Sequence, residues 1–233
     1  MTGFRCKEFF VAHDRCGMKV GTDSLILGSW LNVHAVRTVL DMGAGSGILS
    51  MMVAQRALQA EIDAVEIDQD AAEQAQDNFL NTPWNNRLRS IHGDVTQWHP
   101  VKKYDLIVSN PPYFLAGQTL NCVKRQQARL DEQLPIDRLL DQAGALAHDH
   151  TRIALVLPME RLSDVESWAQ LNQWSLHRVL HIQTRADKMV RRVAIELVHV
   201  EASLMYEQLC IMDENNQYTA EFKSLTKAFY LAF

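Results

Sequence analysis

The residues with the most specific chemistry are Ser109-Asn110-Pro111-Pro112-Tyr113, which directly follow the apolar segment 104–108. The two prolines restrict the turn, so the Pro111 carbonyl and the neutral amide oxygen of Asn110 are available as acceptors. Both oxygens can accept from one planar NH2 group. The lone pair of such an amine is delocalised, and two acceptors on its hydrogens favour the pyramidal, nucleophilic form. Tyr113 can stack on a nucleobase that carries such an amine. We therefore predict that Asn110, Pro111, Pro112 and Tyr113 are catalytic.

A glycine-rich turn follows another apolar strand, in Val39-Leu40-Asp41-Met42-Gly43-Ala44-Gly45-Ser46-Gly47-Ile48. Backbone of this composition can approach a ligand closely at the start of a helix. The third glycine falls at Gly47, so the spacing differs from that of a dinucleotide fingerprint. It resembles motif I of S-adenosylmethionine-dependent methyltransferases. This implies that the methionine and ribose parts of the cofactor pass over Gly43, Ala44, Gly45 and Gly47, with Asp41 near the ammonium, directly or through water.

Two acids lie at the ends of the next strands. Glu66 follows Gly47 by 66 − 47 = 19 residues, where a ribose-binding acid belongs, and its carboxylate can accept from both ribose hydroxyls. Asp68 competes for this role but is better suited to cap the next helix. By resemblance to the same methyltransferases, Asp94 would accept from the cofactor's adenine amino group, and the backbone N–H of Val95 would meet the ring.

The elements that must position these residues follow an alternating α/β pattern. Apolar runs predict seven strands, and segments of helical period separate them. The expected strands are 36–41, 62–66, 88–92, 106–109, 153–157, 175–181 and 193–200, and the expected helices are 24–30, 46–57, 69–80, 136–147 and 161–171.

The connection between the last two expected strands, residues 182–192, is too short for a crossover helix, so these strands should pair antiparallel. The fold class is therefore α/β: a Rossmann-like, seven-stranded methyltransferase sheet with helices on both faces and an antiparallel last strand. A chain of 233 residues can build one such domain. We expect a single domain over residues 1–233, with an N-terminal extension (1–35) packing on the cofactor side, a catalytic core (36–200) and a C-terminal extension (201–233).

Composition excludes several other classes. With 47% hydrophobic and 22% charged residues, the chain is typical of a globular protein. No apolar run approaches the roughly 18 residues of a membrane span, and residues 1–15 lack the apolar core of a signal peptide. The four cysteines lack metal-type spacing, and the pair His148 and His150 has no further ligand cluster. We expect no metal, no membrane association and a cytoplasmic location.

The flanking segments resemble the bacterial tRNA1(Val) adenine-N6 methyltransferase family. Residues 9–23 are similar to its opening, residues 125–129 to its segment after the catalytic turn, and Tyr218-Thr219 with 228–231 to its closing helix. The resemblance implies S-adenosylmethionine-dependent methylation of the adenine immediately 3′ of the anticodon, adenine 37, with tRNA as the partner. In that family the segment 19–23 packs beside the cofactor. Thr22 or Asp23 could thus reach its methionine end, or could instead cap the following helix.

Two basic clusters are candidates for binding RNA phosphates. One contains Lys124, Arg125 and Arg129, and the other contains Arg185, Lys188, Arg191 and Arg192. A net charge of −5 weighs mildly against a general nucleic-acid binder, so either cluster could equally be a solvated charged face.

Other functions share part of the pattern. A base amino methyltransferase acting on adenine N6 or guanine N2 of rRNA is the nearest alternative. A protein-glutamine N5-methyltransferase would use the same motif, but those enzymes carry a substantial helical domain before motif I, where this chain has only forty residues. A non-catalytic cofactor- or RNA-binding subunit would not need the acceptors at Asn110–Tyr113. No obligate protein partner is evident.

Overall fold

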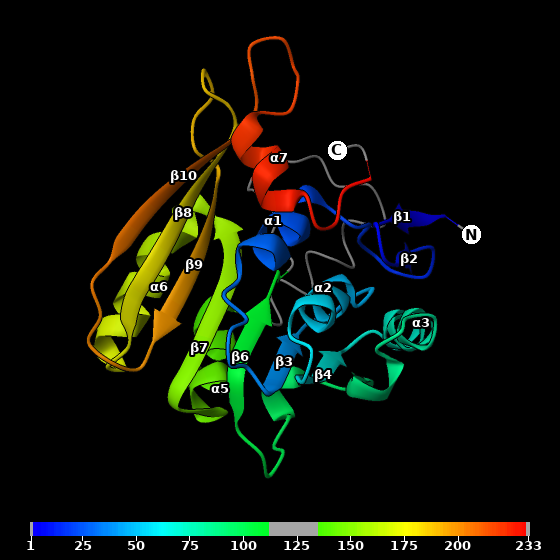
Figure 1. The fold of residues 1–233 in the computed structure, drawn as a ribbon. Coiled ribbons are helices and arrows are strands. Elements are labelled where there is room, and N and C mark those ends of the chain that lie inside the picture. The colour runs from blue at the N-terminus through cyan, green and yellow to red at the C-terminus, as the bar shows by residue number, and fades with distance from the viewer. Residues whose placement is uncertain (1, 112–134, 232–233) are drawn as a thin grey trace.

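The computed structural model describes residues 2–111 and 135–231. Its centre is an eight-stranded sheet with the order β10-β8-β9-β7-β6-β3-β4-β5 (Figure 1). The strands are β3 (Thr38–Met42), β4 (Glu61–Glu66), β5 (Leu88–His92), β6 (Tyr104–Ser109), β7 (Ala147–Pro158), β8 (Ser175–Arg185), β9 (Arg192–Val198) and β10 (Met205–Met212). A separate hairpin pairs β1 (Gly3–Arg5) with β2 (Phe10–Ala12).

The predicted fold class is confirmed, with one correction at the end of the sheet. All seven expected strands form, and β9 runs antiparallel to both β7 and β8, as the short connection requires. An eighth strand that we did not predict, β10, lies beside β8 and runs parallel to it. The sheet therefore has eight strands, and the antiparallel strand is β9, which is not the last strand in the chain.

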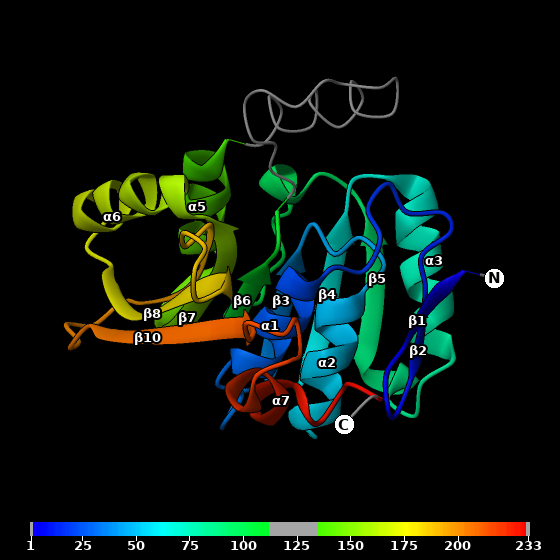
Figure 2. The ribbon, with the colours of Figure 1, turned by 90° about the horizontal axis from the view of Figure 1, so that it is seen from above.

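Helices cover both faces of the sheet (Figure 2). One face carries α1 (Thr22–Trp30), α2 (Ile48–Arg56), α3 (Gln69–Leu80) and α7 (Ala220–Thr226), and the other carries α5 (Ile136–Ala145) and α6 (Leu162–Leu171). Short 3-10 turns span Asn85–Arg87, Val95–Gln97 and Met159–Arg161. Alternate residues of the central strands point to opposite faces, so Leu106 and Val108 join one core while Ile107 joins the other.

Helices α1 and α2 pack side by side on one face of the sheet, α1 against β7 and α2 against β4, and residues Ile48 to Ala54 of α2 are all buried. The two helices approach closely at Gly28, where a Cβ would come within 2.6 Å of the Met52 sulfur. This close packing fixes the start of α1, and with it residues 22–24, relative to the turn after β3.

The N-terminal and C-terminal segments pack on the same face. Asn78 of α3 donates to the carbonyls of both Ala12 and Ser46 at 2.9 Å, which ties β2 to the glycine-rich turn. The aromatic rings of Phe9 and Phe229 lie 6.5 Å apart, and the Lys7 N–H donates to the Phe229 carbonyl. The segments outside the sheet thus contribute to the packing around α1 to α3.

Gly43 and Gly47 of the turn after β3 both have a strained backbone, but only Gly47 is crowded by a neighbouring side chain. Gly43 and Gly47 have φ values of +74° and +78°, which cost a residue with a side chain about 1 kcal/mol. A Cβ at Gly43 would meet nothing within 4 Å, whereas one at Gly47 would lie 2.7 Å from the Phe79 Cζ. We expect Gly43→Ala to lose about 1 kcal/mol of unfolding free energy and Gly47→Ala about 1–3 kcal/mol more, from overpacking. Urea unfolding measures both, and equal losses would contradict this packing.

Candidate active site

The site lies where β3 and β6 end side by side. The two strands pair in parallel, with Asp41 opposite Val108, and the Ser109 hydroxyl donates to the Met42 carbonyl at 2.6 Å. The carboxyl ends of adjacent parallel strands share one edge of the sheet, where ligands of open α/β folds bind. The glycine-rich turn and the Asn110–Pro111 segment therefore face each other.

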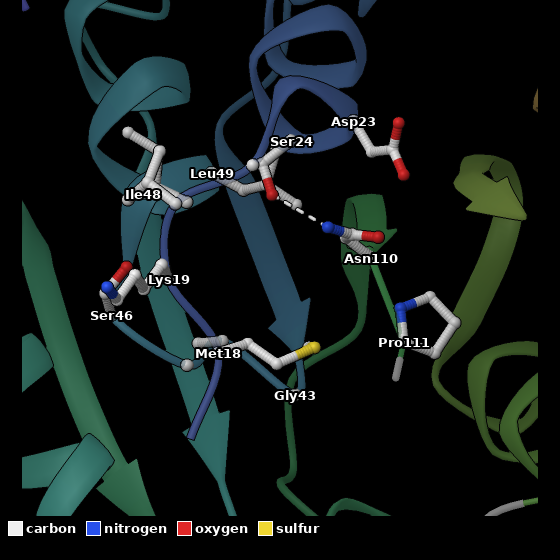
Figure 3. Close-up of a pocket in the computed structure, with 14 residues that line it drawn as sticks. Met18, Lys19, Asp23, Ser24, Gly43, Ser46, Ile48, Leu49, Asn110 and Pro111 are labelled. Carbon is white, nitrogen blue, oxygen red and sulfur yellow. Dashed lines mark hydrogen bonds between the residues drawn. The ribbon is translucent and has the colours of Figure 1, made fainter. Parts of the chain in front are cut away.

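A cavity of about 180 Å³ occupies this position (Figure 3). Three parts of the chain that are far apart in sequence contribute to its lining: the stretch before and within the start of α1, the stretch after β3, and Asn110 with Pro111 after β6. Its lining residues are Met18, Lys19, Val20, Gly21, Asp23, Ser24, Gly43, Ala44, Gly45, Ser46, Ile48, Leu49, Asn110 and Pro111. The predicted Gly47 is not among them. Sequence reasoning missed Met18, Ser24, Ser46, Ile48 and Leu49, since none was assigned a role of its own.

The glycine-rich turn presents an open backbone to this cavity. The N–H groups of Gly43 and Ala44 donate to the Val65 carbonyl at 2.9 and 3.1 Å, which fixes the turn against β4. A Cβ at either Gly43 or Gly45 would meet no atom within 4 Å. The structure therefore leaves space beside the turn that a ligand could fill.

Asp41 is fully buried directly behind the turn. One carboxylate oxygen accepts from the N–H and the hydroxyl of Ser50, while the other, Oδ1, is buried without a hydrogen-bond partner in the described structure. Burial raises the pKa of Asp41 to about 7, although the Ser50 bonds lower it. Asp41 does not line the cavity, but its unpartnered oxygen could accept from a cation or a water molecule beside the turn.

Glu66 is bound to the backbone of the site. Its carboxylate accepts from the N–H of Gly45 at 2.7 Å and from that of Asp68 at 3.0 Å. Burial raises the pKa of Glu66, and these two hydrogen bonds oppose the rise. Asp68 accepts from the Ala71 N–H and caps α3. This is the capping role that the sequence favoured for Asp68 over binding the ribose.

Asp94 also bonds within its own turn. It accepts from the N–H and hydroxyl of Thr96 at 2.9 and 2.7 Å, and from the Gln97 side chain at 3.1 Å. Val95 is buried beside it, and neither residue lines the cavity. The Gly93 N–H donates to the Glu66 carbonyl, so Asp94 and Glu66 lie at neighbouring strand ends.

The start of α1 differs from one of the two expectations for Thr22 and Asp23. The N-cap is Gly21, which makes no side-chain capping bond, so the interpretation of Thr22 or Asp23 as a cap is wrong. The helix begins at Thr22, two residues before the expected start at residue 24, because Gly21 and not Thr22 or Asp23 has the extended backbone of an N-cap. Asp23 lines the cavity and accepts from Arg192 Nε at 3.1 Å, whereas Thr22 does not line it.

Asn110 is placed by a hydrogen bond to α1. Its Nδ2 donates to the Ser24 hydroxyl at 2.8 Å, across 86 residues of sequence (Figure 3). With the NH2 end directed to α1, the Oδ1 end of the amide is the acceptor that Asn110 can offer a ligand. Pro111 follows on the cavity wall, and Pro112 and Tyr113 lie outside the described residues.

The second basic cluster lies at the connection from β8 to β9. Arg185 and Lys188 contact Asp187 at 2.9 and 3.6 Å, Arg192 pairs with Asp23, and Arg191 is exposed. The Asp23 pair links this cluster to the cavity wall. The first cluster, Lys124, Arg125 and Arg129, lies outside the described residues.

The described residues offer neither a cluster of metal ligands nor a membrane-spanning helix. Residues 2–111 and 135–231 contain no group of three or more His, Cys, Asp or Glu side chains that could hold a metal ion. Within the same ranges, no helix is long and apolar enough to cross a membrane.

Comparisons with known proteins show the family of the chain. Residues 16–133 match the model of the methyltransferase small domain. A tRNA1(Val) (adenine(37)-N6)-methyltransferase of Tolumonas auensis is 43% identical over 98% of this chain and 96% of its own length. One of Edwardsiella ictaluri is 44% identical over 99% of this chain and 94% of its own.

Solved structures share the fold at low sequence identity. A protein of Agrobacterium tumefaciens described as a predicted O-methyltransferase superposes with a TM-score of 0.70 at 19% identity, over 88% of this chain and 96% of that one. A glycopeptide N-methyltransferase gives a TM-score of 0.54 at 11% identity, over 71% and 82% of the two chains. These likenesses support the fold alone.

The buried Asp41 predicts how stability depends on pH in the absence of ligand. Its folded pKa of about 7 exceeds the unfolded value, so the folded state holds more protons between about pH 4 and 7. The contribution of Asp41 to stability is thus fully present below about pH 4 and is lost as the pH rises through about 7. We expect Asp41→Asn to gain roughly 2–3 kcal/mol of unfolding free energy relative to wild type between pH 5 and pH 8. A difference that stays constant with pH in urea unfolding would contradict this.

Proposed function

The chain belongs to the tRNA1(Val) (adenine(37)-N6)-methyltransferase family, and we propose that the cavity at the ends of β3 and β6 is its catalytic site. The protein is an S-adenosylmethionine-dependent methyltransferase that acts on the N6 amino group of adenine 37 in tRNA1(Val). Its tRNA substrate supports a cytoplasmic location. The observation that carries the site assignment is that Asn110 and Pro111 line the same cavity as residues 43–46.

The residues around the turn fit S-adenosylmethionine. The open sides of Gly43 and Gly45 leave room beside the backbone, and the unpartnered Asp41 oxygen suits a nearby ammonium group. The cavity is smaller than the roughly 300–1,000 Å³ usual for ligand sites, so it would hold only part of the cofactor. We assign it to the methionine end, with Glu66, Asp94 and Val95 serving the ribose and adenine outside it. When bound, the cofactor supplies an electrophilic methyl group on its sulfonium.

Asn110 and Pro111 act on the amino group of the target adenine. The Asn110 Oδ1 and the Pro111 carbonyl accept its two hydrogens, which draws the lone pair out of conjugation and directs it away from both acceptors. This arrangement needs no strong base, because the acceptors stabilise the developing positive charge on the nitrogen. From the sequence, Tyr113 would stack on the extruded base and Pro112 would keep the turn rigid.

The surface beside the cavity is suited to hold the anticodon stem-loop. The exposed Arg191 and the neighbouring Arg185, Lys188 and Arg192 form a basic edge that reaches the cavity through the Asp23–Arg192 pair. Such side chains neutralise phosphates without selecting a base. Lys124, Arg125 and Arg129 follow the catalytic turn in sequence and would contribute to the same interface.

Loss of the Glu66 carboxylate should weaken cofactor binding. A carboxylate that binds ribose hydroxyls contributes charge-assisted hydrogen bonds, each worth about 1.5–3 kcal/mol. We expect Glu66→Ala to raise the S-adenosylmethionine Kd by about tenfold or more in calorimetry. Glu61→Ala, at the exposed opposite end of β4, is the matched control and should bind as wild type. An unchanged Kd in the folded Glu66 variant would remove this residue from the cofactor site.

Asn110→Ala tests the catalytic assignment. Removal of one preorganised acceptor from the transition state should lower the single-turnover rate by roughly a hundredfold or more, whereas cofactor affinity and folding should not change. The measurement is methyl transfer to tRNA1(Val) with saturating protein and cofactor. A transcript with guanosine at position 37 should accept no label. Transfer by Asn110→Ala at the wild-type rate would disprove the proposed amine mechanism.

A further inference from the structure

Ser24 gives the Asn110 amide a hydrogen-bond partner within the cavity lining, at 2.8 Å. Ser24 is 6% exposed and lies in the first turn of α1 (Figure 3). The bond joins the helix before motif I to the loop after β6. The catalytic motif alone gives no indication of this contact.

The two ends of an asparagine amide are alike in shape but opposite in hydrogen bonding. The Oδ1 end accepts, while the Nδ2 end carries two donors. If the amide turned over, its NH2 would face the amino group of the adenine and two donors would oppose each other. The catalytic turn therefore needs contacts that hold the Asn110 amide in place.

We propose that Ser24 is the positioning residue that holds the Asn110 amide in place beside the cavity, an inference that rests on the proposed function. Its hydroxyl accepts from Nδ2. This bond ties the amide to α1, with Oδ1 as the end that would meet the amine. Ser24 acts through Asn110 and makes no contact with the reacting atoms.

The position of Ser24 is itself firmly held. The next residues of α1, Leu25, Ile26 and Leu27, are at most 1% exposed, and Gly28 packs closely against Met52 of α2. A partner on such a rigid element restricts the amide more than one on a loop would, because its own position varies little. The N-terminal segment thus orders the catalytic asparagine in addition to lining the cavity.

Single-turnover methyl transfer to tRNA1(Val) tests this role. We expect Ser24→Ala to lower the rate by about tenfold to a hundredfold, the scale of a misoriented catalytic group, and the loss to persist at saturating S-adenosylmethionine. Ser29→Ala is the matched control, since Ser29 lies on the same helix and its buried hydroxyl has no hydrogen-bond partner in the described structure. This control should keep the wild-type rate. A wild-type rate for Ser24→Ala would overturn the proposal.

A double-mutant cycle with Asn110→Ala separates positioning from general support of the fold. If Ser24 acts through Asn110, adding Ser24→Ala to Asn110→Ala should not slow transfer further. Equal fold-losses in both backgrounds would show that Ser24 acts elsewhere and would overturn the proposal. If Asn110→Ala alone were fully active, the proposed function would fail first, and the role of Ser24 with it.

Ser24→Cys covers the case in which the alanine variant does not fold. The thiol fills nearly the same space but accepts hydrogen bonds weakly. It should therefore fold and transfer slowly, as Ser24→Ala does. A wild-type rate for Ser24→Cys would also contradict the proposal.

Discussion

The parallel pairing of β3 with β6 is the constraint on which the site depends. It places the ends of two strands side by side, although Asp41 and Val108 are far apart in sequence, and the Ser109–Met42 hydrogen bond joins the strands at that edge. The turn after β3 can then provide open backbone and the turn after β6 can provide acceptors within one cavity. A shift of either strand by one residue would turn Asp41 and Ser109 toward the opposite face.

Segments outside the sheet provide the rest of the cavity wall. Helix α1 supplies one wall of the cavity and the hydroxyl that orients Asn110, while the Asp23–Arg192 pair connects that helix to β9. Asn78 bonds to both β2 and Ser46, so the N-terminal hairpin is coupled to the glycine-rich turn. Residues that precede motif I therefore help to build the cavity and to hold Asn110.

The sequence predicted the central elements because their signals are local. Strand β5 and helix α3 form over the expected residues, and Gly43, Gly45 and Gly47 all have positive φ, as the turn required. Strand β10 was missed because it is an edge strand whose residues are mostly exposed or half-buried, so its apolar pattern is weak. The Asn110–Ser24 bond was missed for another reason: it joins residues 86 positions apart, and a serine in a helix carries no sign of a distant partner.

We propose that this cavity is where N6 of adenine 37 in tRNA1(Val) is methylated. The most direct measurement is mass spectrometry of nucleosides from tRNA1(Val) of a strain that lacks the protein, before and after treatment with the purified chain and S-adenosylmethionine. We expect N6-methyladenosine to be absent before treatment and to appear at position 37 alone afterwards. A methyl group on another base, or N6-methyladenosine at another position, would contradict it.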